Sequence, residues 1–299
     1  MWGASSPTGI PVSDVMLALD VERKHLRRRG GARMYRTLFR IGPLEIHGYG
    51  TLLMVGFIAG ILLSRREARR LGLSPEIPLD FGIWLLVAGV VMARGMYVLL
   101  NWSAFAARPA EVLYIWREGG LSFHGGLLGG VLAGLEFARR RGLRFWTVAD
   151  MATPGLALGY GIARFGCLLN GCCYGAPTAL PWGMRFPLWP DSPIMTDPSH
   201  PTQVYSALGS FLVLAVLLLV RNRLKVRGQL FLLYLMLYAP VRAVVEIFRE
   251  GYTARALVGG MTEAQVASAV IFAAALVGFV LLGRRGPVGA AGEGAADPP

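Results

Sequence analysis

The stretch F-L-V-L-A-V-L-L-L-V at residues 211–220 has no polar side chain, and V-I-F-A-A-A-L-V-G-F-V-L-L-G at 270–283 is of the same kind. A helix of ~20 mostly apolar residues crosses the hydrocarbon core of a bilayer. Working outward from these two runs, we find five further candidates. The predicted spans are 44–63, 79–102, 119–138, 148–169, 203–220, 229–248 and 264–283. The sequence therefore predicts an all-α integral membrane protein with seven transmembrane helices.

Composition supports a membrane protein. Of the 299 residues, 54% are hydrophobic and 16% are charged, whereas soluble domains carry roughly 25% charged residues. This balance excludes a disordered or fibrous chain. The net charge of +12 would suggest nucleic-acid binding in a soluble protein. Here the basic residues lie in short blocks between apolar runs, which indicates membrane topology, and we expect no nucleic-acid partner.

The basic residues also predict an orientation. The loops after the first, third and fifth spans, with the segment after the seventh, hold 14 Lys and Arg, and the other loops hold 5. Cytoplasmic loops are the basic ones, so the C-terminus is predicted in the cytoplasm and the N-terminus outside. The outer loop 171–202 is expected to form a small cap, and the loop 101–118 a short amphipathic helix.

The N-terminal region disagrees with this count, because residues 23–40 carry eight further basic residues on the predicted outer side. No apolar core precedes them, which excludes a secretory signal. We expect residues 1–40 to be a basic arm, with translation starting at Met34; a disordered arm that is translated is the alternative. Residues 41–285 would form the membrane domain, and 286–299 a disordered low-complexity tail.

Three arginines fall inside predicted spans, where each costs ~2.5–3.5 kcal/mol to insert and marks a functional candidate. They are Arg94, Arg164 and Arg242, and His124, Asp150 and Glu246 accompany them. Structural alternatives stay open. Glu246 lies one turn after Arg242 and is placed to pair with it, Arg94 could anchor helix packing, and Asp150 could be a cap or a partner for a cytoplasmic arginine.

These residue types suit one chemistry. Guanidinium groups hold a phosphate by paired hydrogen bonds and stay charged, and a histidine removes a proton near neutral pH. A lipid phosphate gripped by arginine therefore suits a group transfer in which phosphate leaves.

The cysteines at 167, 172 and 173 lack zinc-finger spacing and are too few for a disulfide framework. We expect no metal site, although His200 lies near them in sequence.

The chain resembles the prolipoprotein diacylglyceryl transferase family from about Ile41 to Gly283. Six blocks carry the resemblance in family order: I-G-P-L-E-I-H-G-Y-G at 41–50, A-R-G-M-Y-V-L at 93–99, G-G-L-S-F-H-G-G-L at 119–127, G-I-A-R-F-G at 161–166 followed by N-G at 170–171 and Y-G at 174–175, H-P-T-Q-V-Y at 200–205, and R-A-V-V-E-I-F-R at 242–249.

The resemblance implies transfer of the sn-1,2-diacylglyceryl group of phosphatidylglycerol to the lipobox cysteine of a prolipoprotein. A thioether forms and glycerol 1-phosphate leaves, without metal or organic cofactor, at the outer face of the bacterial cytoplasmic membrane.

The resemblance also implies the site. Arg164 would bind phosphatidylglycerol, with Arg94 and Asn170 beside it. Arg242 would stabilise charge on the phosphate, and Glu246 would position Arg242. His124 would be the base that forms the acceptor thiolate, and Tyr49 would hydrogen bond to head group or thiol; which of these two takes the proton stays open.

Two positions depart from the family pattern. Many members have Asn three residues after the phosphate-binding arginine and Glu eight after it, where this chain has Cys167 and Cys172. A thiol does not replace the two donors of an amide, so the role of these positions is open.

Two other classes of membrane protein are alternatives to a transferase. A transporter or channel for an anion would also contain intramembrane charges, but no internal symmetry is visible, and an intramembrane protease lacks a nucleophile–base arrangement.

Overall fold

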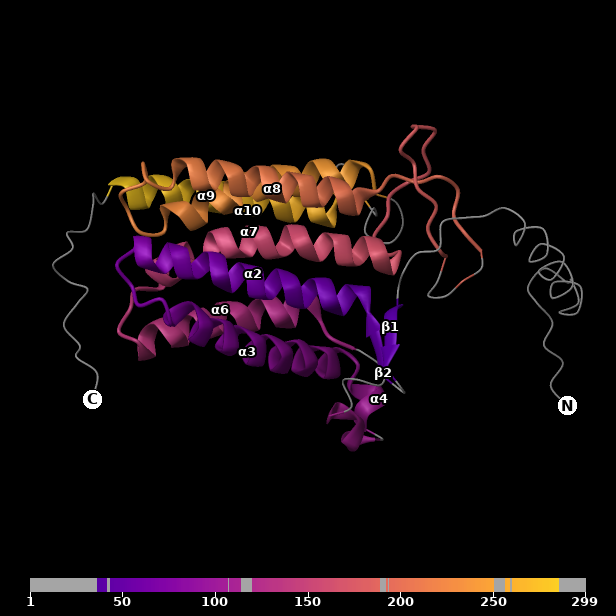
Figure 1. Cartoon of the computed structure of the whole chain (residues 1–299), viewed down its shortest axis with the longest axis horizontal. Coiled ribbons are helices and arrows are strands. Elements are labelled where there is room, and N and C mark those ends of the chain that lie inside the picture. The colour runs from indigo at the N-terminus through magenta and orange to yellow at the C-terminus, as the bar shows by residue number, and fades with distance from the viewer. Residues whose placement is uncertain are drawn as a thin grey trace, which may run out of the picture. The chain divides into compact units, whose positions relative to one another are not determined.

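The computed structural model describes residues 37–41, 44–106, 108–113, 120–188, 192, 194–249, 256–258 and 260–284. Helices dominate this part of the chain (Figure 1). They are α2 (Gly48–Arg70), α3 (Ile77–Leu100), α4 (Trp102–Ala106), the 3-10 helix η1 (Pro109–Leu113), α6 (Phe123–Arg140), α7 (Phe145–Asn170), α8 (Thr202–Val220), α9 (Gln229–Ile247) and α10 (Glu263–Arg284). Met34 and the tail 286–299, with the expectations placed on them, lie outside the described residues.

Five of these helices are long and apolar enough to cross a membrane: α2, α3, α8, α9 and α10. Each of the seven predicted spans coincides with a long helix, but α6 and α7 do not meet that standard of hydropathy because they carry more polar and small residues. The chain is thus an α-helical protein of the multi-pass membrane type. Seven spans, and their orientation, remain predictions.

Short strands are the feature that the all-α prediction missed. Strand β1 (Thr37–Ile41) pairs antiparallel with β2 (Leu44–His47), and β3 (Ala256–Val258) pairs with β4 (Met261–Thr262). The first span was predicted from residue 44, whereas α2 begins at Gly48. Residues 44–47 pair with β1 instead, so the helix begins only after this hairpin. Strand β1 also begins within the stretch assigned to the basic arm.

The chain divides into two compact units, which we describe separately. The first contains the described residues of 1–54, 161–209 and 241–267, and the second those of 55–160, 210–240 and 268–299. Several helices contribute their two halves to different units.

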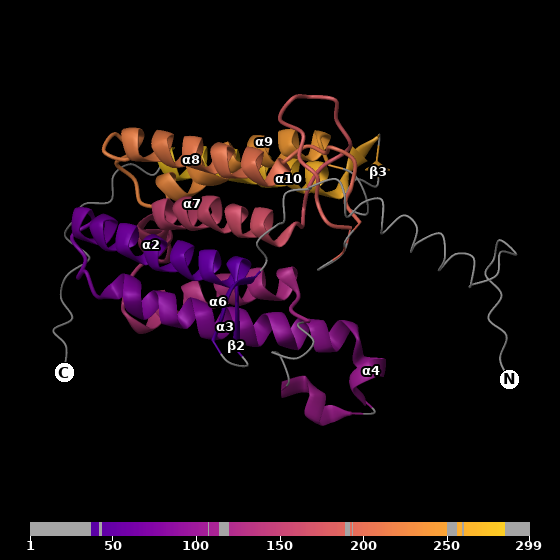
Figure 2. The same ribbon diagram turned by 45° about the vertical axis from the view of Figure 1, so that its right-hand side comes forward.

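In the second unit, helices pack closely through glycine. Helices α3 and α6 lie side by side (Figures 1 and 2). A Cβ on Gly129 would lie 2.6 Å from the carbonyl oxygen of Ala88. Where α2 meets α7, a Cβ on Gly60 would lie 2.9 Å from the carbonyl oxygen of Gly155. Small residues allow such contact between helix backbones in lipid. Many large apolar side chains instead point outward, as on α3 and α10, which suits a hydrocarbon solvent.

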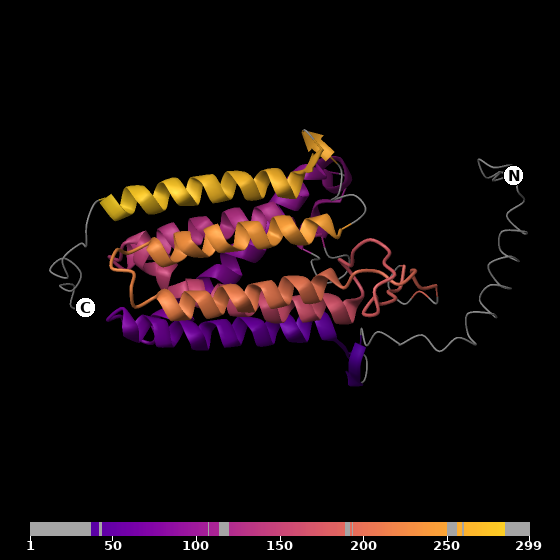
Figure 3. The same cartoon turned by 90° about the horizontal axis from the view of Figure 1, so that it is seen from above.

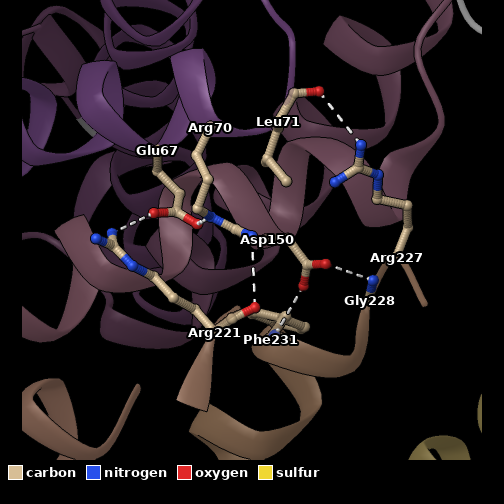
Figure 4. A network of polar contacts seen from close by, with 8 residues as sticks. All are labelled: Glu67, Arg70, Leu71, Asp150, Arg221, Arg227, Gly228 and Phe231. Carbon is tan, nitrogen blue, oxygen red and sulfur yellow. Dashed lines mark hydrogen bonds and ion pairs between the residues drawn. The ribbon is translucent and has the colours of Figure 1, made fainter. Parts of the chain in front are cut away.

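The second unit also contains a buried network of charges (Figure 4). Glu67 is fully buried and pairs with Arg70 and, at 2.7 Å, with Arg221. Asp150 accepts hydrogen bonds from the backbone N–H groups of Gly228 at 2.6 Å and Phe231 at 2.9 Å. Because α9 begins at Gln229, Asp150 caps that helix from outside it. The expectation that Asp150 is a cap is confirmed.

In the first unit, the segment 171–201 connects the end of α7 to the start of α8, and its described residues form no helix (Figure 3). Its described residues fold back on themselves through bridges such as Pro177 with Ser199 and Pro187 with Met195. Phe186 is fully buried and stacks on Tyr174 with 4.8 Å between ring centroids. The predicted cap is therefore a folded segment, and its outer location is a prediction.

We predict that Asp150→Ala lowers the free energy of unfolding by about 1.5–3 kcal/mol, because two backbone donors lose a charged acceptor. Denaturant titration in detergent micelles would measure the loss. Asp80→Ala is the matched control, since Asp80 is 38% exposed in its pair with Arg141, and it should cost at most about 1 kcal/mol. Equal losses in the two variants would contradict the cap.

Candidate active site

The end of α7 positions the first part of the site, in the first unit. The helix ends at Asn170, and Gly171 follows with a φ of 70°. The backbone N–H of Gly171 donates to Leu168, and that of Cys172 donates to Cys167, both at 3.1 Å. This pair of bonds is a Schellman motif, which requires a left-handed residue after the helix and favours glycine there. The chain thereby reverses direction directly after Asn170.

Three thiols meet at this turn. The sulfur atoms of Cys167, Cys172 and Cys173 all lie within 4.8 Å of one another. Cys173 has a φ of 64°, and among the described residues it is the one non-glycine residue in that region. Hydrogen bonds from the other two thiols, and then the guanidinium groups of Arg249 and Arg164, hold the pKa of Cys173 below its ordinary value.

Arg164 and Tyr49 belong to the same cluster. Both lie close enough to interact electrostatically with each other and with the thiols. The close approach of α2 to α7 occurs at Gly166, where a Cβ would lie 3.2 Å from the carbonyl oxygen of Tyr49. The side chain of Asn170 hydrogen bonds to Cys172. Tyr49, Arg164 and Asn170, predicted from three separate motifs or positions, are thus brought together around the turn.

The last turn of α9 supplies a buried carboxylate between two guanidinium groups. Arg242 pairs with Oε2 of Glu246, and Nε of Arg249 lies 3.9 Å from the same oxygen. The Glu246 side chain is fully buried, and its Oε1 has no hydrogen-bond partner among the described residues. The pairing of Arg242 with Glu246, left open from the sequence, is present.

Two residues of the site were not predicted. Arg249 was counted only as a loop charge, yet it lies beside Glu246 and Cys173. Gln203, in the H-P-T-Q-V-Y block, is buried and donates from Nε2 to the carbonyl oxygen of Cys172 at 2.6 Å, while its Oε1 has no partner in the described residues. The available signal in the sequence was a polar glutamine at the start of the apolar predicted span 203–220.

His124 and Arg94 belong to the second unit. His124 is the second residue of α6 and is exposed to solvent or lipid. Ser122 caps this helix by accepting from the backbone N–H of Gly125. Gly125 is where α6 comes closest to α3: a Cβ there would lie 2.4 Å from the carbonyl oxygen of Met92. In the H-G-G motif, the imidazole of His124 is therefore accessible, while the glycine after it packs tightly against α3.

Arg94 is buried, and its guanidinium group holds the chain that leads to this helix start. It donates to the carbonyl oxygens of Val112 at 2.9 Å, Glu111 at 2.7 Å and Gly120 at 3.1 Å. Two aromatic rings that contact each other, those of Tyr97 and Phe105, complete its surroundings. This geometry supports the structural alternative for Arg94, which positions the segment before His124. Its predicted contact with lipid stays a prediction.

The fold and site define an α-helical membrane protein in which basic side chains surround a buried carboxylate and a group of thiols. Comparison with known proteins identifies its family. The family model described as prolipoprotein diacylglyceryl transferase matches residues 36–281. The chain belongs to this family of transferases, which confirms the resemblance seen in the sequence.

Relatives agree with this assignment over most of their length. The phosphatidylglycerol–prolipoprotein diacylglyceryl transferase of Gloeobacter violaceus is 40% identical over 253 residues, which are 83% of this chain and 93% of the relative. The protein of the same name from Synechococcus elongatus is 37% identical over 82% of this chain and 86% of its own. A third, from Shouchella clausii, is 35% identical over 82% and 89%.

We predict that Gly125→Ala destabilises the protein by about 1–3 kcal/mol, because the added methyl group overlaps the α3 backbone. Gly126→Ala is the matched control from the same motif. Its Cβ would lie 3.7 Å from Ala93, an ordinary contact, so its stability should change by less than about 1 kcal/mol. Denaturant titration of both variants measures this, and an equal response would contradict the close packing behind His124.

Proposed function

We propose that this protein transfers the sn-1,2-diacylglyceryl group of phosphatidylglycerol to the lipobox cysteine of prolipoproteins. A carbon–sulfur bond forms, the bond from the same carbon to the phosphate oxygen breaks, and glycerol 1-phosphate leaves with the electron pair. The observation that carries this proposal is the cluster of Arg164, Arg242 and Arg249 around Glu246 and the turn after α7, in a chain whose relatives carry this activity in their names.

Each side chain of the cluster has a proposed role. Arg164 grips the lipid phosphate, with Asn170 beside it, because a guanidinium group presents paired donors and keeps its charge. Arg242 stabilises the negative charge that grows on the departing phosphate. Glu246 positions Arg242, and its Oε1, which has no partner in the described part of the chain, suits a hydroxyl group of the glycerol head. Tyr49 donates a hydrogen bond to head group or thiol.

His124 is proposed as the base that removes the proton of the acceptor thiol, because the thiolate is the nucleophile. Its exposure is compatible with this role. Arg94 supports it by holding Gly120, whose φ of 79° turns the chain two residues before the cap of α6. Arg94 is thus proposed as a positioning residue, and direct contact with the lipid is the alternative.

We also propose the membrane arrangement expected from the sequence. Seven helices, α6 and α7 among them, would cross the bacterial cytoplasmic membrane, with the C-terminus inside and the site toward the outer face. The clustering of Arg70, Arg221 and Arg227 at the Asp150 end of the second unit supports this (Figure 4), since basic residues gather on the cytoplasmic side. The family match favours this transferase over the transporter considered from the sequence.

Arg164→Ala should reduce transfer at least about 100-fold, because the lipid phosphate loses a preorganised charged partner. The assay combines purified protein, phosphatidylglycerol vesicles and a lipobox peptide, and detects the diacylglyceryl peptide by mass spectrometry. Arg185→Ala, in the exposed part of the 171–201 segment, is the matched loss of one positive charge and should retain activity. Full turnover by Arg164→Ala would refute its role.

His124→Gln should slow transfer by about 10²–10⁴-fold, as expected when a general base is removed, while phosphatidylglycerol binding is retained. Lipid retention is measured by native mass spectrometry and turnover by the peptide assay. Loss of both would assign His124 a structural role instead.

A further inference from the structure

The three thiols form a group that the proposed reaction does not use. Cys167 is on the last turn of α7, and Cys172 and Cys173 follow the Schellman turn. Their sulfur atoms converge within 4.8 Å although four residues separate the first from the second. The turn produces this convergence, because it brings the backbone of Cys172 back to the carbonyl group of Cys167.

The start of α8 holds the turn from the other side. Thr202 donates from its hydroxyl group to the carbonyl oxygen of Cys173, and Gln203 donates to that of Cys172, both at 2.6 Å. Both of these side chains belong to residues that are 1% exposed. They stabilise a positive φ at Cys173, which costs free energy in a residue with a Cβ. The backbone that carries Cys172 and Cys173 is therefore held in place before any ligand binds.

We propose that Cys167, Cys172 and Cys173 together bind one Zn²⁺ ion through their sulfur atoms. Zinc bonds to thiolate at about 2.3 Å in tetrahedral geometry, which places the sulfur atoms roughly 3.8 Å apart. The observed spacing needs only small side-chain movements to reach it. This site departs from the metal-free chemistry expected from the sequence, where the C-x4-C-C spacing did not match zinc fingers.

Charge also suits the ion. Three thiolates with Zn²⁺ leave one net negative charge, and Arg164 and Arg249 already lie within electrostatic reach of Cys173. Opposite charges in a poorly hydrated site stabilise each other strongly. Thiolate ligands select soft or borderline ions such as zinc over magnesium or calcium.

The fourth position of the ion is open, since no other His, Cys, Asp or Glu of the described ranges joins this group. Three protein ligands with an open position are typical of zinc sites that bind a substrate. Resting on the proposed function, we assign the fourth position to the acceptor cysteine. Its thiol loses its proton to the base of the proposed reaction, and the sulfur binds zinc as a thiolate. That sulfur then forms the new bond to carbon and leaves as the thioether.

Metal content tests the site independently of catalysis. Full-length protein, purified in a phosphine reductant and supplied with zinc, should retain about one zinc per chain after gel filtration, measured by plasma mass spectrometry. Cys172→Ser combined with Cys173→Ser should lose it, whereas His200→Gln, from the neighbouring segment, should keep it. A wild-type protein that has three free thiols and no zinc would overturn the proposal, as would equal zinc in the double variant.

A cobalt spectrum avoids dependence on variants that may unfold. Wild-type protein loaded with Co²⁺ should show a thiolate-to-cobalt absorption band, and its absence overturns the site. A lipobox peptide should change that band, and the same peptide with serine in place of cysteine should not. An unchanged band would exclude the acceptor from the fourth position. Bound zinc without any transfer would refute the proposed function and leave the metal site standing.

Discussion

A guanidinium group that enters apolar surroundings keeps its charge, and this constraint organises both units of the protein. Five arginines of the described residues, buried or partly exposed, lie near groups that offset their charge. Arg94 donates to three backbone carbonyl groups and lies beside two aromatic rings. Arg70 and Arg221 share the carboxylate of Glu67, and Arg242 and Arg249 share that of Glu246. Because unpaired buried charge is costly, these contacts determine which helix ends and loops come together.

The two kinds of pairing have different consequences for function. Around Glu67 and Asp150, carboxylates meet guanidinium and backbone donors, and the bonds from Glu67 to Arg221 and from Asp150 to Gly228 join different elements (Figure 4). Around Glu246, one carboxylate oxygen serves two guanidinium groups and the other has no partner in the described residues. The first arrangement is structural. The second suits a site that receives a polar, anionic ligand from the lipid, and the thiols beside it give that site a second kind of chemistry.

Hydropathy was sufficient to predict α2, α3, α8, α9 and α10, because apolar runs of span length have few other structures open to them. Hydropathy missed the two hairpins, because strands of two to five residues are too short to show an alternation of polar and apolar residues. Motifs predicted Tyr49, Arg164 and Asn170, which the structure brings near one turn, but they did not show that the guanidinium group of Arg94 would donate to backbone carbonyl groups, a contact made by tertiary structure. The convergence of the cysteines was equally hidden, because it depends on a left-handed Gly171 and an unusual φ at Cys173 and not on ligand spacing.

The central claim is that basic side chains from separate helices grip one lipid phosphate. An experimental structure with a non-cleavable phosphatidylglycerol analogue tests it most directly, through the distances from the phosphate oxygens to the guanidinium nitrogens. The account predicts hydrogen-bond distances, about 2.7–2.9 Å, from that phosphate to Arg164 and Arg242. A phosphate bound elsewhere, with Arg242 engaged only by Glu246, would contradict it.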